Sequence, residues 1–116
     1  MEPEYREGLV LRHYVDAVAE QVGVEAGAAL CESGPRPSAY IALADSCSAW
    51  PERLLMLLWN GDEGWRLALE PDGPEEPVII ATWPRPLRPA PARVARRLRD
   101  ALRDSAEVVA PAGDSA

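Results

Sequence analysis

Residues 54–70 read LLMLLWNGDEGWRLALE and carry the strongest structural signal in the chain. The first six residues are apolar at every position, which is typical of a strand with both faces at least partly covered. Residues 65–70 alternate large apolar side chains with small or charged ones, as in a half-buried strand. Because Asn-Gly and the second glycine supply positive φ at low cost, the stretch predicts a β-hairpin with residues 60–64 as its loop.

The register of this hairpin follows from the loop length. It places three pairs of large apolar residues opposite one another, namely Trp59 with Trp65, Leu57 with Leu67, and Leu55 with Leu69. A slip by one residue would put Arg66 and Glu70 on that face instead. The predicted register therefore gives the sheet one strongly apolar face.

The chain on both sides of the hairpin predicts three more strands and two helices. Residues 28–33, 39–44 and 78–83 are short apolar segments between turn signals, and the last is rich in β-branched side chains. Apolar stripes at helical spacing predict one helix over about residues 7–22 and another from Pro91 to about residue 104. The stripes consist of Leu11, Tyr14, Val15, Val18 and Val22, and of Pro91, Val94, Leu98, Ala101 and Leu102.

This order of elements predicts the fold class. The connections between the strands are too short for helical crossovers, so the five-stranded sheet should be an antiparallel meander. Two amphipathic helices and one apolar sheet face predict a two-layer α+β domain with the N-terminal and C-terminal helices on one face. We expect residues 1–104 to form this single domain and residues 105–116 to be a flexible C-terminal tail.

Length and composition limit the possible functions. The 116 residues are enough for one small domain. No apolar run approaches the roughly 20 residues that span a bilayer, and the acidic N-terminus lacks the apolar stretch of a secretory signal, so we expect a cytoplasmic protein that does not enter a membrane. Two cysteines and one histidine are too few for a disulfide scaffold or for a zinc or haem site, and no cofactor is predicted.

Charge is distributed unevenly along the chain. The net charge is −7, and all 12 basic residues are arginine. Residues 85–103 hold seven arginines and one acid, which gives this segment +6 and leaves −13 on the rest of the chain. The arginines opposite the apolar stripe of the last helix are Arg93, Arg96, Arg99 and Arg103. They are candidate anion contacts or, alternatively, a solvated helix face, and the acidic remainder of the chain disfavours nucleic acid as a partner.

The sequence contains no clear catalytic set. His13 lies opposite the apolar stripe of its helix and is expected at the surface. Cys31 and Cys47 have no CxxC spacing, so we expect reduced, partly buried thiols rather than metal ligands. The acids at strand ends are candidates for acid–base chemistry, although nothing in the sequence places any two of them together: Glu32, Asp45 and Glu70.

Two apolar features are candidate binding sites. The tryptophans at one edge of the predicted sheet either line a small-molecule pocket or close the core under a helix, and they are Trp59, Trp65 and Trp83. The residues that alternate with the core-facing positions of the third strand point away from the helices, and they are Leu54, Met56 and Leu58. Arg66, Ala68 and Glu70 would flank this row. It is either covered by the Pro-rich segment 84–91 or the C-terminal tail, or exposed as an interface for a protein partner or a second copy.

Several local segments match a known pattern. The most specific are PERLLMLLWN at residues 51–60 and GWRLALE at residues 64–70, and they are accompanied by YVDAVAE at residues 14–20 and AYIAL at residues 39–43. Together they resemble the actinobacterial domain-of-unknown-function family numbered six-two-nine-two over roughly residues 11–102. The resemblance implies a small cytoplasmic protein without an assigned activity and supplies no catalytic residues.

The sequence thus favours one functional class over two others. A small domain without a catalytic set but with spare apolar surface is typical of a non-catalytic module for protein interaction or homodimerisation. The alternatives are a small-molecule-binding domain or an enzyme with a pocket at the tryptophan-rich end of the sheet, and a nucleic-acid-associated accessory that acts through the arginine-rich helix.

Overall fold

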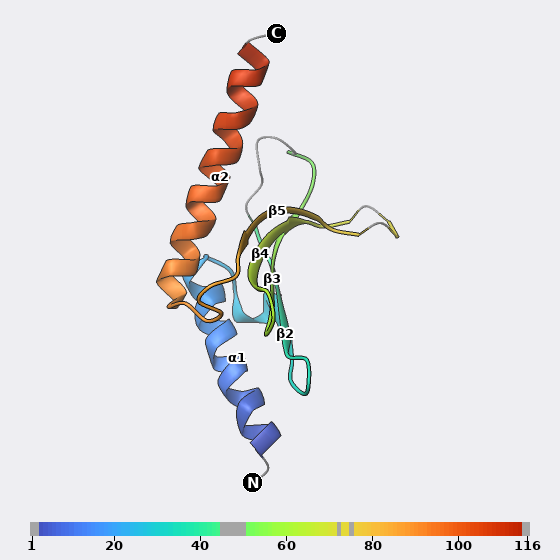
Figure 1. Ribbon diagram of the computed structural model, residues 1–116, viewed down its shortest axis with the longest axis vertical. Helices are drawn as coiled ribbons and strands as arrows, with labels where there is room; N and C mark the ends of the chain where they lie inside the picture. The colour runs from blue at the N-terminus through green and yellow to red at the C-terminus, as the bar shows by residue number, and fades with distance from the viewer. Residues whose placement is uncertain (1–2, 45–50, 72, 75, 115–116) are drawn as a thin grey trace.

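The computed structural model describes residues 3–44, 51–71, 73–74 and 76–114 (Figure 1). Its elements are α1 (Pro3–Gln21), the 3₁₀ helix η1 (Ala26–Ala28), β1 (Ala29–Glu32), β2 (Ser38–Ala42), β3 (Leu55–Asn60), β4 (Gly64–Leu69), β5 (Val78–Trp83) and α2 (Pro91–Asp114). The predicted order of helix, five strands and helix is confirmed.

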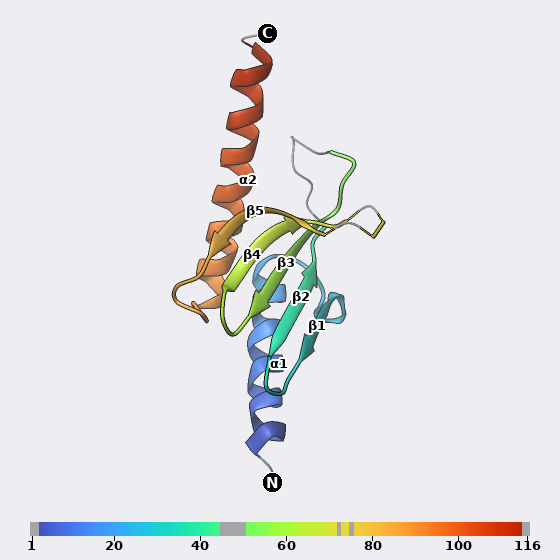
Figure 2. The ribbon, with the colours of Figure 1, turned by 45° about the vertical axis from the view of Figure 1, so that its right-hand side comes forward.

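The five strands form one sheet in the order β1-β2-β3-β4-β5, so neighbours in sequence are also neighbours in space. All four pairings are antiparallel, as short connections require. Both helices lie on the same face of the sheet (Figures 1 and 2). The predicted two-layer α+β meander is therefore confirmed.

The core lies between this sheet face and the helices. Its buried residues are Ala39, Ile41, Leu43, Leu55, Leu57, Trp59, Trp65, Leu67 and Leu69 from the sheet and its connections, and Leu11, Val15, Val18, Val94 and Leu98 from the helices. Burial of one large apolar side chain stabilises a fold by roughly 1.5–3 kcal/mol, so this layer is the main source of stability. We refer to the opposite side of the sheet as the outer face.

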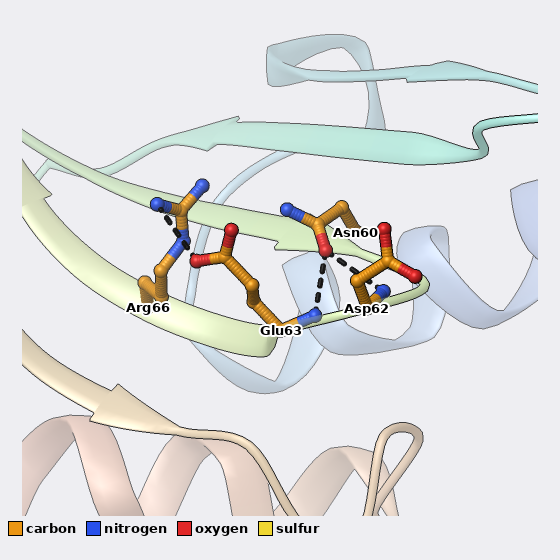
Figure 3. Close-up of polar contacts among 4 residues, drawn as sticks. All are labelled: Asn60, Asp62, Glu63 and Arg66. Carbon is orange, nitrogen blue, oxygen red and sulfur yellow. Dashed lines mark hydrogen bonds and ion pairs between the residues drawn. The ribbon is translucent and has the colours of Figure 1, made fainter.

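The β3–β4 hairpin has the predicted register, with Trp59 opposite Trp65. Its loop is shorter than predicted because Asn60 and Gly64 pair as the last strand residues and leave three residues in the turn. The Asn60 side-chain oxygen accepts hydrogen bonds from the backbone N–H groups of Asp62, at 2.9 Å, and Glu63, at 2.7 Å (Figure 3). This side chain therefore replaces the backbone partners that the turn residues lack.

Element boundaries differ from the prediction mainly at the helices. α1 begins at Pro3, ahead of the expected residue 7, and α2 continues to Asp114, beyond the expected end near residue 104. The sequence ALRDSAEVVA at residues 101–110 contains several good helix formers, which explains the extension. The flexibility expected for residues 105–116 stays a prediction. The short helix η1 was not predicted.

Gly64 generates the first testable prediction. Its φ is +71°, and a β-carbon at this position would lie 2.7 Å from the carbonyl oxygen of Trp83. Gly64→Ala should therefore lower the free energy of unfolding, measured by urea denaturation, by about 1–3 kcal/mol. Gly27→Ala is the matched control, because nothing lies within 4 Å of a β-carbon there. Equal stabilities of the two variants would contradict this role of Gly64.

Candidate functional site

The three tryptophans of the predicted pocket lie side by side in the core layer, where Trp65 pairs with Trp59 and with Trp83. Trp65 is 0% exposed and Trp59 is 2% exposed, whereas Trp83 is partly exposed. The Trp59 indole N–H donates a hydrogen bond to the Leu87 carbonyl at 2.7 Å, and the Arg88 guanidinium lies 5.2 Å from the centre of the Trp59 ring. These contacts fit the core-closing alternative rather than a pocket.

A polar node joins Trp65 to helix α1 and to the Pro-rich segment. The Trp65 indole N–H donates to the Tyr14 hydroxyl at 3.1 Å, and that hydroxyl donates to the Pro89 carbonyl at 2.6 Å. The two rings lie 6.2 Å apart at 48°. Burial raises the pKa of Tyr14, and the hydrogen bond from Trp65 opposes this only in part. The node is structural, and the helical stripe alone did not reveal the role of the hydroxyl.

The predicted arginines of α2 are brought to the exposed side of that helix. All four are exposed, namely Arg93, Arg96, Arg99 and Arg103. Within the part of the chain that the structure describes, their one ion pair joins Arg103 to Asp100 at 3.9 Å. The neighbouring Arg97 is instead partly buried and donates to the Arg85 carbonyl at 3.3 Å. An exposed arginine stripe with one long ion pair is compatible with an anion contact and with a solvated face alike.

The candidate chemical groups do not converge. His13 is exposed on α1, and Cys31 is a free, partly exposed thiol. Asp45 and Cys47 lie outside the described residues. Among the residues that the structure does describe, no three His, Cys, Asp or Glu side chains are grouped so as to hold a metal ion.

The outer face of the sheet is the most distinctive surface. No described helix covers it, because α1 and α2 both lie on the opposite side (Figures 1 and 2). Leu30 is 64% exposed and Leu54 is 63% exposed, while Leu58 is partly exposed. As predicted, Arg66 flanks Leu58 in the neighbouring strand. Leu30 is not among the residues that the sequence analysis predicts for this face, because its segment has only a weak strand pattern.

Met56 departs from the other two residues of the predicted interface. It is only 4% exposed, although it faces away from the main core. The Tyr40 hydroxyl donates to a carboxylate oxygen of Glu70 at 2.8 Å, which links β2 to the end of β4 across β3. This bridge crosses the row in which Met56 pairs with Ala68, and it explains why both are buried. Met56 is therefore covered by the chain itself, though not by the Pro-rich segment, which packs on the helix side.

A shallow groove crosses the outer face next to this bridge. Its volume is about 280 Å³. One cross-strand row supplies Leu30, Tyr40, Leu58 and Arg66, and the adjoining row supplies Glu32, Ser38 and Asn60. The groove thus has an apolar middle, a cation at one end and a carboxylate at the other. Figure 3 shows Arg66 standing above β4, with the Glu63 carboxylate beside its guanidinium.

The polar node generates a prediction about stability and pH. Tyr14→Phe removes a hydroxyl with two partners and should cost about 1–3 kcal/mol, because the Trp65 N–H loses its acceptor. Tyr40→Phe should cost less, because its hydroxyl bonds at the partly exposed outer face.

The Tyr14 hydroxyl also predicts a dependence of stability on pH. Since the folded state raises the pKa of Tyr14, the contribution of Tyr14 to the free energy of unfolding is complete below about pH 10 and is lost as pH rises through the raised pKa. Thermal unfolding above that pH should therefore be less pH-dependent in Tyr14→Phe, and an unaltered dependence would contradict the assignment.

The outer face generates a second prediction. Met56→Glu should destabilise the fold by several kcal/mol, because it replaces an apolar side chain that is only 4% exposed with a carboxylate. Leu54→Glu should change the free energy of unfolding by no more than about 0.5 kcal/mol, because that side chain is exposed. Urea denaturation of both variants checks this contrast, and a stable Met56→Glu protein would show that the site is open.

Comparisons with known proteins place the chain in a family. Among the described helices, none combines the length and apolar character needed to cross a membrane. Comparison with curated proteins finds no match, and comparison with solved structures finds none either. A model of a family of unknown function (DUF6292) matches residues 14–100, well over half of the chain and the region that contains the whole sheet. The chain therefore belongs to the family DUF6292.

Proposed function

We propose that the chain is a non-catalytic protein-interaction module that binds its partner through the outer face of the sheet. The observation that carries this proposal is the exposure of Leu30 and Leu54 on a sheet face that no described helix covers. Exposed apolar groups that gather on one face commonly mark an interaction surface. A partner can contact the apolar side chains at the edges of this face but not those at its centre, because Met56 is covered by the Tyr40–Glu70 bridge.

The arrangement of polar groups favours this class of function over catalysis. Tyr14 and the buried indole N–H groups are occupied with structural hydrogen bonds, and His13 is exposed at the surface of α1. The outer face mixes arginines with carboxylates, which suits a protein surface better than a polyanion such as nucleic acid. An actinobacterial origin and a cytoplasmic location, which the family resemblance implies, are part of the same proposal.

Site-specific photo-crosslinking in cells of the source organism tests the proposal. A photoreactive amino acid at Leu54 should yield adducts of discrete mass, because the partner covers this side chain. Arg99 on the exposed side of α2 is the control position, and it should give no such adduct. Adducts from Arg99 alone would move the interaction to the arginine stripe. Adducts from neither position would refute the interaction.

A further inference from the structure

Arg66 on the outer face lacks the partners that a shielded guanidinium normally has. Its side chain is 23% exposed, and its one ion pair within the described residues is a contact of 3.4 Å from Nη1 to the Glu63 carboxylate. Glu63 is 58% exposed, so this carboxylate is free to leave. The Arg66 Nε–H group is buried and has no hydrogen-bond partner in the part of the chain described. A guanidinium has five N–H donors, so most of the capacity of Arg66 is unused.

The surroundings of Arg66 select a single carboxylate over a phosphate. A planar guanidinium matches the two oxygens of a carboxylate in a bidentate contact. The groove already contains Glu32 at its other end and Glu63 beside the arginine. Arg66 is the one cation among the described residues that line the groove, so the second negative charge of a dianionic phosphate would have no matching cation there. The site therefore fits one acidic side chain, which replaces Glu63 at the guanidinium.

The apolar part of the groove sets the second requirement of the ligand. Leu58 lies one strand away from Arg66, and the exposed Leu30 lies two strands further in the same row. Neighbouring strands are about 4.8 Å apart, so Leu58 lies about 5 Å from the arginine along this row, Tyr40 about 10 Å and Leu30 about 14 Å. In an extended peptide, residues at i and i+2 project to the same side about 6.7 Å apart. An apolar residue two positions from the acid therefore reaches Leu58 and the Tyr40 ring beside it.

We propose that this groove binds an extended segment of a partner protein in which an acidic residue, seated on Arg66, is two positions from an apolar residue that covers Leu58 and the Tyr40 ring. This inference rests on the proposed function, since it names the kind of partner that the outer face accepts. Arg66 supplies the selectivity for charge, and Leu58 with the Tyr40 ring supplies apolar contact that is indifferent to charge.

A pair of short peptides tests the proposal. The acetylated and amidated peptides LSESL and LSQSL are the same size, and each presents its central residue two positions from a leucine on either side. Titration of the full chain is followed by NMR of backbone amides and arginine Nε–H groups. LSESL should shift signals of β1–β4 and of the Arg66 Nε–H, and LSQSL should bind at least about tenfold more weakly.

Matched variants separate the arginine from the general charge of the chain. Arg66→Gln should remove the preference for LSESL, and Arg66→Lys, which keeps the charge without the planar fork, should retain part of it. Arg99→Gln on α2 should leave the preference intact. Leu58→Ala should weaken both peptides equally.

Two results would overturn the inference. One is equal affinity of the two peptides for the unaltered protein, and the other is the absence of any shift in groove signals up to the solubility limit of LSESL. Crosslinking from Leu54 does not depend on Arg66, so adducts there would preserve the proposed function even if this inference fails. The loss of both would reject the two proposals together.

Discussion

The pairing of β3 with β4 determines which side chains meet the helices, and the rest of the packing depends on it. Adjacent residues of a strand point to opposite faces, so this register sends Trp65 under the helices and leaves Leu58 and Arg66 outside. A slip by one residue would bury the Arg66 charge in the core, at a cost of several kcal/mol. Gly64 adopts the positive φ that ends the turn, and its missing side chain also leaves room for the carbonyl at the end of β5.

The Pro-rich segment after β5 completes the core through its carbonyl groups. Proline has no backbone N–H, so residues 84–91 cannot continue a strand pairing, and their carbonyl oxygens remain available as acceptors. Two of these carbonyls, of Leu87 and Pro89, accept hydrogen bonds from Trp59 and Tyr14. Buried polar groups require hydrogen-bond partners, and these carbonyls supply them to the indole and phenol groups without water. A segment that looks irregular in the sequence is thus held in place by the aromatic residues that it covers.

The fold could be predicted from the sequence because its signals are local. The alternation in residues 65–70 and the turn residues before it specify both the hairpin and its register, and the helical stripes specify which sides are buried. Contacts between distant residues could not be predicted in this way. The bridge from Tyr40 to Glu70 spans three strands and buries Met56, whereas alternation says only that Met56 faces outward. The end of α2 could not be predicted from its apolar stripe, because the stripe stops at Leu102 whereas good helix formers continue beyond it.

Two helices suffice to cover one face of a five-stranded sheet, so the outer face depends on its own side chains for protection. The Tyr40–Glu70 bridge shields the centre, and burial together with the Glu70 carboxylate raises the pKa of Tyr40. Leu30 and Leu54 lie outside this bridge and remain exposed. A face with a closed centre and apolar groups at its edges offers separate apolar contacts rather than one continuous patch. This arrangement supports the proposed binding of a short partner segment, in which a single guanidinium decides the specificity for charge.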